Sequence, residues 1–309
     1  MESKMDKLTN LTNKESLNWE RFEFLNNDLL LKGKILLPND IENCKGFIIF
    51  VHGLGYCNKS YEIDDAMVTN NGWAFVKYNL RGHAGVDGEW TINDSVNDLI
   101  GYTNYLKSTF TFKNKDNIGF IAHSTGGLIA ILAYLKSGNF CFGSIINLIS
   151  SLHTSYYWWF KSGYSKEVQR YFAIKGIVLP KVKQFFEDIT PFKDVENDKI
   201  LKDEYSFPYR YGLLRGNCFH TFLYEIKNSP DILKETEKID IPLVLYKSKV
   251  DEVIDNNVSE IFFRDIRSKH KKIVEVDPDE GSLRHFLLKS WPKIEKQSIE
   301  FFNAYYLSK

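Results

Sequence analysis

The stretch that decides the fold is residues 117–127, which read Asn117-Ile118-Gly119-Phe120-Ile121-Ala122-His123-Ser124-Thr125-Gly126-Gly127. A short apolar run ends at His123 and Ser124, and two glycines then lead into the apolar segment 128–135. The first run predicts a buried strand, and the apolar segment behind the glycines predicts a buried helix. The sequence therefore predicts a strand, a sharp turn and a helix, with a serine at the apex of the turn.

A serine in this position is typical of the nucleophile elbow of serine hydrolases. The tight turn exposes the hydroxyl at the carboxyl edge of a sheet, and the helix behind it offers N–H groups and a positive dipole end to a developing oxyanion. Small residues are needed two positions before and after the serine, where strand and helix cross closely. Ala122 and Gly126 occupy these positions. The alternative is a serine that merely caps a core helix, and the rest of the chain has to decide between the two.

Composition and charge restrict the classes of protein to which the chain can belong. With 309 residues, 43% of them hydrophobic, it fits one large α/β domain with an insertion. Basic and acidic residues balance at 40 each, so charge gives no argument for a nucleic-acid partner. No stretch is long and apolar enough for a signal peptide or a membrane span. We expect a soluble, cytoplasmic protein whose four cysteines are thiols, with a disulfide as the alternative.

Strand and helix patterns alternate on both sides of the elbow. Continuous apolar runs predict strands buried on both faces of a parallel sheet, and apolar residues at helical spacing predict the helices between them. Besides the elbow, the expected strands are 19–24, 29–37, 46–52, 72–79, 143–150, 241–246 and 272–276, and the expected helices are 61–70, 91–110, 255–268 and 291–307. This alternation predicts an α/β fold with a doubly wound, mostly parallel, eight-stranded sheet.

The alternation stops between residues 151 and 240. This segment is dense in aromatic residues, among them the run 156–160, and prolines interrupt it. We interpret it as a helical cap inserted into a core formed by residues 1–150 and 241–309. Its rings either line an acyl pocket above the serine or pack the cap onto the core, and both uses remain open. The run 156–160 is where we expect contact with the site, or transient contact with a membrane surface.

A serine nucleophile needs a general base, and the base needs a carboxylate that orients it. In a sheet of this kind the carboxylate follows the strand after the cap, and the histidine follows the last strand. Asp251 and His285 occupy these two positions. Singly, Asp251 could be a loop-capping carboxylate and His285 a surface residue, but the order of serine, aspartate and histidine favours catalysis. Asp255 is the rival for the acid.

The oxyanion would need two converging backbone N–H groups. Thr125 follows the serine at the start of the helix and supplies one. Leu54, between Gly53 and Gly55 in the loop after an early strand, is the second expected donor. The plainer interpretation of residues 52–55 is an ordinary turn at the end of a strand.

These motifs together resemble the α/β-hydrolase superfamily. They are most similar to its monoacylglycerol lipase and lysophospholipase branch, also described as serine aminopeptidase-like hydrolases, and the resemblance covers residues 20–305. It rests on His52-Gly53-Leu54-Gly55, Arg81-Gly82-His83, Ala122-His123-Ser124-Thr125-Gly126-Gly127, Asp251 and His285. The resemblance implies Ser124 as nucleophile, Asp251 as acid, His285 as base, and Leu54 and Thr125 as oxyanion donors.

Three positions depart from the pattern of that superfamily. Ala122 replaces a glycine of the elbow, and Ala84 replaces a glycine of the loop 81–85. Asn79 stands where the superfamily usually has an aspartate that supports this loop, so we expect altered loop packing with Ser124, Asp251 and His285 retained. We expect His83 and His123 to be structural or pocket-lining.

The expected activity is hydrolysis of a small-molecule carboxylic ester through an acyl-enzyme, with monoacyl lipid esters as the favoured substrates. We predict no cofactor, and no metal because no set of ligating residues has metal-site spacing. A peptidase or amidase would use the same three residues, with cap carboxylates among residues 187–196 holding a substrate amine. A catalytically inactive binding protein is the third alternative. Dehalogenase and epoxide hydrolase chemistry is disfavoured, because those relatives have aspartate in place of Ser124.

Overall fold

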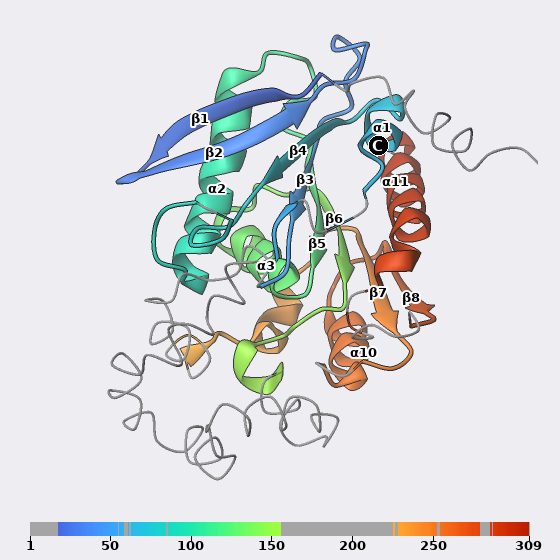
Figure 1. The fold of residues 1–309 in the computed structure, drawn as a ribbon. Helices are drawn as coiled ribbons and strands as arrows, with labels where there is room; N and C mark the ends of the chain where they lie inside the picture. Colours follow the sequence, from blue (N-terminus) through green and yellow to red (C-terminus); the bar gives the residue numbers. More distant parts are fainter. Residues whose placement is uncertain are drawn as a thin grey trace, which may run out of the picture.

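An eight-stranded sheet with helices on both faces forms the centre of the molecule (Figure 1). The computed structural model describes residues 18–54, 56–58, 61, 63–84, 86–155, 225, 228–251, 254–278, 285 and 287–308. The strands are β1 (Glu20–Asn26), β2 (Leu29–Leu36), β3 (Phe47–Val51), β4 (Ala74–Tyr78), β5 (Ile118–His123), β6 (Phe142–Ile146), β7 (Leu243–Ser248) and β8 (Lys271–Val276). Their order in the sheet is β1-β2-β4-β3-β5-β6-β7-β8. The pairs β1–β2 and β2–β4 are antiparallel and all others are parallel.

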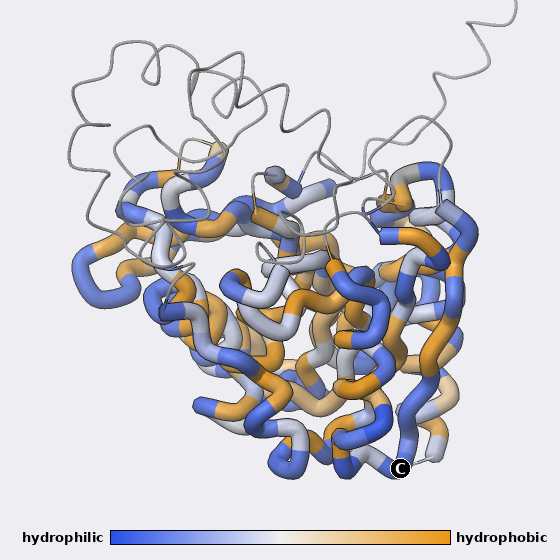
Figure 2. Tube along the Cα trace, turned by 90° about the horizontal axis from the view of Figure 1, so that it is seen from below, coloured by the Kyte–Doolittle hydropathy of each residue, from blue (hydrophilic) through white to orange (hydrophobic). Residues whose placement is uncertain are grey.

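Two apolar clusters, one on each face, hold the helices to the sheet. The first face carries α2 (Ile92–Thr109), α3 (Thr125–Ser137), the 3-10 helix η5 (Ile232–Lys238) and α10 (Asn256–Asp265). The second carries α1 (Asp65–Asn70) and α11 (Trp291–Leu307), which the short 3-10 turn η6 (Leu288–Ser290) precedes. Figure 2 shows hydrophobic segments running through the interior and hydrophilic ones around the rim. The doubly wound, mostly parallel α/β sheet predicted from the sequence is confirmed.

Two elements differ most from the sequence-based prediction, each by four residues at one end. The helix expected from residue 61 begins at Asp65, because the Asp64 carboxylate caps it by accepting from the N–H of Met67. Tyr61 is instead buried against the sheet. The strand expected over 143–150 ends at Ile146, because Asn147 adopts a left-handed backbone conformation with φ 49°. An extended strand cannot continue through such a residue.

Most of the predicted cap, residues 156–224 and 226–227, lies outside the described residues. The two chain ends that flank it are hydrogen-bonded side by side. The N–H of Leu152 donates to Ser229 Oγ at 2.8 Å, and the N–H of Ile232 donates to the carbonyl of Ser150 at 3.0 Å. A segment that leaves and re-enters at one point has the geometry of an insertion, while the boundaries 151–240 stay a prediction. No helix among the described residues combines the length and apolarity needed to cross a bilayer.

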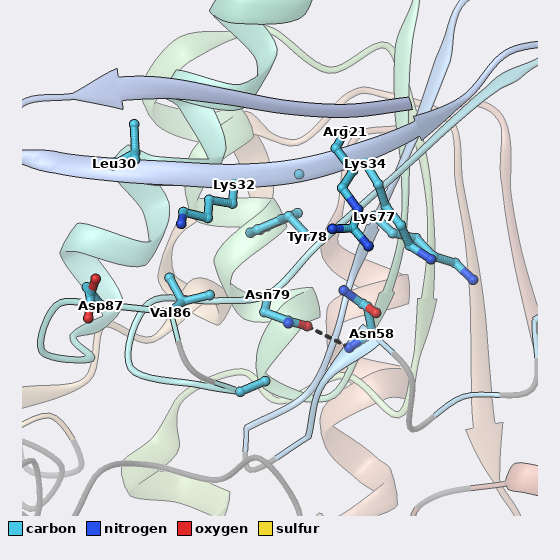
Figure 3. A pocket seen from close by; sticks show the side chains of 12 residues that line it. Arg21, Leu30, Lys32, Lys34, Asn58, Lys77, Tyr78, Asn79, Val86 and Asp87 are labelled. Atoms are coloured by element: carbon cyan, nitrogen blue, oxygen red, sulfur yellow. Dashed lines mark hydrogen bonds between the residues drawn. The ribbon is translucent and has the colours of Figure 1, made fainter. Parts of the chain in front are cut away.

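The antiparallel part of the sheet carries a row of cations across three strands. Arg21 on β1 lies directly opposite Lys34 on β2, which lies directly opposite Lys77 on β4. Figure 3 shows these side chains on one face of the sheet, lining the same hollow. Lys77 is paired with Asp65, and the Lys34 ammonium lies 3.9 Å from the centre of the Trp19 ring. Like charges directly opposite each other in a sheet are destabilising.

We therefore expect Arg21→Glu to stabilise the fold. The substitution converts a like-charge pair with Lys34 into an opposite-charge pair, worth about 0.2–1 kcal/mol. Thermal unfolding should show a higher Tm than wild type, with a gain that shrinks at high salt. Glu23→Arg is the matched reverse control, because Glu23 is paired with Lys32 on the same two strands and its replacement should lower the Tm. A Tm for Arg21→Glu at or below that of wild type would contradict the expectation.

Candidate active site

Ser124 sits in a strained turn between β5 and α3. Its backbone has φ 55° and ψ −120°, a combination that L-residues rarely adopt and that costs about 1–3 kcal/mol. The turn is held by a hydrogen bond from the Ser124 N–H to the carbonyl of Ile146, at 2.9 Å, at the end of β6. Gly126 makes the turn sterically possible, because a Cβ there would lie 2.3 Å from the carbonyl oxygen of Val51. Ala122 is fully buried at the end of β5, in a space that admits its one methyl group.

Ser124, His285 and Asp251 form one hydrogen-bonded line. His285 Nε2 lies 2.8 Å from Ser124 Oγ, and His285 Nδ1 lies 2.8 Å from Asp251 Oδ2. The second carboxylate oxygen, Oδ1, accepts from the N–H of Ile254 at 2.9 Å, which fixes the carboxylate. All three residues are buried, with 6% of Ser124, 5% of Asp251 and 2% of His285 exposed. A serine hydroxyl, an imidazole and a carboxylate in this arrangement can transfer a proton from the hydroxyl to the ring and stabilise the cation that results.

The rival carboxylate, Asp255, is placed differently. It is the N-cap of α10, where its Oδ1 accepts from the N–H of Asn257 at 2.9 Å. The structure thus brings Asp251, and not Asp255, to the imidazole of His285.

The loop after β3 lies against the serine. A Cβ on Gly53 would be 3.3 Å from Ser124 Cβ and 2.8 Å from His123 Nδ1, so only glycine fits without displacing the elbow. Leu54 follows in the same loop and is half-buried. Thr125 is the first residue of α3, and the first N–H groups of a helix have no partner within it. The two expected oxyanion donors therefore belong to segments that flank Ser124, and their role stays a prediction.

A chain of buried hydrogen bonds joins the loop after β3 to the backbone of His285. The N–H of Gly53 donates to Tyr61 Oη at 3.0 Å, and Tyr61 Oη lies 2.9 Å from His123 Nδ1. His123 Nε2 lies 3.2 Å from the carbonyl oxygen of His285, which can only accept, so this nitrogen carries the proton. Burial lowers the pKa of His123 well below its ordinary value and keeps the ring neutral. His123 is thus structural, as expected, and in addition is bonded to the backbone of His285.

The loop after β4 is held by a second set of buried groups. His52 Nε2 accepts from the N–H of Leu80 at 3.0 Å, and Arg81 forms a bidentate pair with Asp98 of α2, with both distances 2.6 Å. Burial lowers the pKa of His52 to about 3 and that of His83 to about 4, so both rings are neutral near pH 7. Asn79, which departs from the superfamily pattern, accepts from the N–H of Asn58 at 2.8 Å through its amide oxygen (Figure 3). Its amide thus bonds the two loops to each other.

Asn147 and Tyr61 contact the site but were not among the residues singled out in the sequence. Asn147 donates from Nδ2 to the carbonyl of His285, and Tyr61 contacts Gly53 and His123. The polar Asn147 within the apolar run 145–149 was a signal that could have been used. Tyr61 gave none, because a tyrosine at the start of an amphipathic segment is unremarkable. Among the described residues, no three histidine, cysteine, aspartate or glutamate side chains are placed to hold a metal ion.

Comparison with known proteins identifies relatives at the level of family and fold. The model of the family described as serine aminopeptidase, S33, matches residues 42–279. A search of curated proteins found no significant match. An esterase from Pyrococcus furiosus superposes with a TM-score of 0.62 at 15% identity, covering 94% of this chain and 93% of that chain. A monoacylglycerol lipase from Paleococcus ferrophilus gives 0.56 at 15% identity, covering 93% and 99%.

A peptidase also shares this fold. An acylaminoacyl peptidase from Pyrococcus horikoshii superposes with a TM-score of 0.60 at 19% identity, and the match covers 98% of this chain and 44% of the peptidase. At these identities the superpositions with solved structures establish a common fold. The family model is the stronger evidence of relationship, because it matches most of the chain.

The strain at Ser124 can be measured by comparing two substitutions. Ser124→Ala and Ser124→Gly both remove the hydroxyl, but only glycine adopts the observed backbone angles without strain. We expect Ser124→Gly to be more stable than Ser124→Ala by about 1 kcal/mol or more in denaturant unfolding. Equal stabilities would show that the turn is not strained.

Buried neutral histidines predict a loss of stability in acid. The pKa of His52 is about 3 in the folded protein and near 6.5 when unfolded, so the unfolded chain binds more protons between these values. The free energy of unfolding should therefore be highest above pH 6.5 and fall as the pH is lowered towards 3. His52→Gln removes this proton linkage and should make the dependence of Tm on pH shallower between pH 4 and 6.5. The same substitution at the exposed His270 is the control, and an unchanged slope for His52→Gln would contradict the prediction.

Proposed function

The chain belongs to the serine aminopeptidase S33 family of α/β-hydrolases, and we propose that it is a serine hydrolase that cleaves carboxylic esters through an acyl-enzyme. The observation that carries this proposal is the buried line from Ser124 Oγ through His285 to Asp251, with both hydrogen bonds at 2.8 Å. Three residues far apart in sequence meet in the geometry that nucleophilic catalysis requires. This arrangement also argues against a catalytically inactive binding protein, which has no need of it.

In the proposed mechanism, the Ser124 oxygen attacks the ester carbonyl while its proton passes to His285 Nε2. Asp251 accepts from Nδ1, keeps the ring in the productive tautomer and stabilises the imidazolium. The N–H groups of Leu54 and Thr125 receive the oxyanion. His285 then gives its proton to the leaving alcohol, and a water molecule repeats the cycle to release the acid and restore Ser124.

Monoacyl lipid esters are the proposed substrates. One structural neighbour is a monoacylglycerol lipase, and the sequence motifs resemble the branch of such lipases, so both support this choice. The aromatic segment 156–160, to which we assign the acyl chain and a transient membrane contact, lies outside the described residues. The cytoplasmic location stays a prediction from composition.

Hydrolysis of peptide or amide bonds is the second candidate. The description of the matching family as serine aminopeptidase and the acylaminoacyl peptidase among the structural neighbours favour it. The same three residues would serve as nucleophile, base and acid. The cap carboxylates that would hold a substrate amine, between residues 187 and 196, also lie outside the described residues.

Removal of the nucleophile should abolish turnover. We expect Ser124→Ala to lower the kcat for p-nitrophenyl esters by at least about 10³-fold, because the proposed acyl-enzyme forms on the Ser124 hydroxyl. A fluorophosphonate probe should label the wild-type protein at Ser124 and fail to label the variant. Turnover or labelling that persists in Ser124→Ala would refute the proposed function.

A matched substrate series separates the two candidate activities in the same wild-type preparation. For an esterase with an apolar acyl site, kcat/KM should rise with acyl length from two to about ten carbons and stay low for aminoacyl p-nitroanilides. The reverse ranking would favour the peptidase.

A further inference from the structure

The backbone of His285 is anchored at its carbonyl oxygen. This oxygen accepts one hydrogen bond from Asn147 Nδ2 and a second from His123 Nε2, at 3.2 Å. The imidazole of the same residue bridges Ser124 and Asp251. His285 is therefore held both at its imidazole and at its carbonyl oxygen.

Asn147 reaches this carbonyl from the end of β6. The residue is 2% exposed, its φ is 49°, and its own N–H donates to the carbonyl of Tyr246 at 2.8 Å. Its amide oxygen accepts from the N–H of Ser248 at 2.8 Å. The orientation of the amide follows from its partners, because the N–H of Ser248 needs an acceptor and the carbonyl of His285 needs a donor.

Residues 146 and 147 thereby contact the three segments that carry Ser124, Asp251 and His285. The carbonyl of Ile146 accepts from the N–H of Ser124 at 2.9 Å, which fixes the nucleophile turn. Asn147 Oδ1 fixes the end of β7, three residues before Asp251, and Nδ2 fixes His285. The end of β6 is thus the common support that fixes the relative positions of the segments carrying Asp251, His285 and Ser124.

We propose that Asn147 is a positioning residue that holds His285 at hydrogen-bond distance from Ser124 and Asp251; this rests on the serine-hydrolase function proposed above. The position demands an unusual combination of properties. It needs one donor and one acceptor on a short side chain, and a backbone that tolerates positive φ. Asparagine offers both hydrogen-bonding groups and is among the few non-glycine residues that adopt this conformation readily. Misplacement of a catalytic group by about 1 Å can cost about 10²-fold in rate.

The test uses Asn147→Gly in the full chain, which removes both side-chain hydrogen bonds and keeps a residue that accepts positive φ. We expect kcat for a p-nitrophenyl ester to fall about 10- to 100-fold, with KM within about twofold, because Asn147 is buried and its amide is bonded to Ser248 and His285. Asn27→Gly is the matched control, since Asn27 has φ 52° in the β1–β2 turn, and it should keep wild-type kinetics. Wild-type kcat in folded Asn147→Gly would overturn the proposal.

A spectroscopic readout separates this proposal from the proposed function. The proton shared by His285 Nδ1 and Asp251 should give a downfield NMR signal in the wild type that broadens or shifts upfield in Asn147→Gly. An unchanged signal in Asn147→Gly would overturn the positioning role of Asn147, whatever the activity of the wild type. Absence of Ser124-dependent turnover in the wild type would instead refute the proposed function and leave the positioning role to the NMR result. If Asn147→Gly does not fold, Asn147→Ser serves instead, because its hydroxyl is too short to reach both partners, and the same two readouts apply.

Discussion

The close crossing of α3 and β3 at Gly126 is the constraint on which the site depends. The helix passes so near β3 that a single added carbon at Gly126 would overlap the carbonyl oxygen of Val51. With the helix held there, the chain has one residue in which to turn from strand to helix, and Ser124 adopts its strained backbone as a result. The same crossing places the start of α3, with its N–H groups, directly behind the hydroxyl. Steric contact between backbone atoms thus determines where the Ser124 hydroxyl points.

Around this turn, the protein uses neutral imidazoles as structural hydrogen-bonding groups. His52, His83 and His123 are all buried, and desolvation lowers the pKa of each, so none carries a charge near neutral pH. A neutral ring offers one donor and one acceptor in a fixed plane, which suits the backbone groups of the loops after β3 and β4. The centre of the His123 ring lies 5.1 Å from that of His285, so a positive charge on His123 would oppose the formation of the His285 imidazolium. A neutral His123 therefore favours the proton transfer proposed for His285.

The parts of the structure that the sequence predicted are those with a local or periodic signal. The apolar runs gave the strands and the doubly wound sheet, and the order Ser124, Asp251, His285 follows from the placement of each at the carboxyl end of a predicted strand. The start of α1 was missed because its cap, Asp64, lies within a segment of helical periodicity. The end of β6 was missed because Asn147 lies between apolar residues on both sides, and only the three-dimensional neighbours of its amide explain why the strand ends there. Tyr61 bonds to residues 8 and 62 positions away, and no one-dimensional pattern encodes such a partnership.

The asparagine at position 79 fits the same electrostatic scheme. A carboxylate there could accept the hydrogen bond from the N–H of Asn58 equally well, so loop support alone does not distinguish the two residues. The difference lies in charge, because an aspartate at this position would add a negative charge between the two loops, whereas the amide of Asn79 is neutral. The amide therefore keeps the hydrogen bond between the two loops and adds no charge to them.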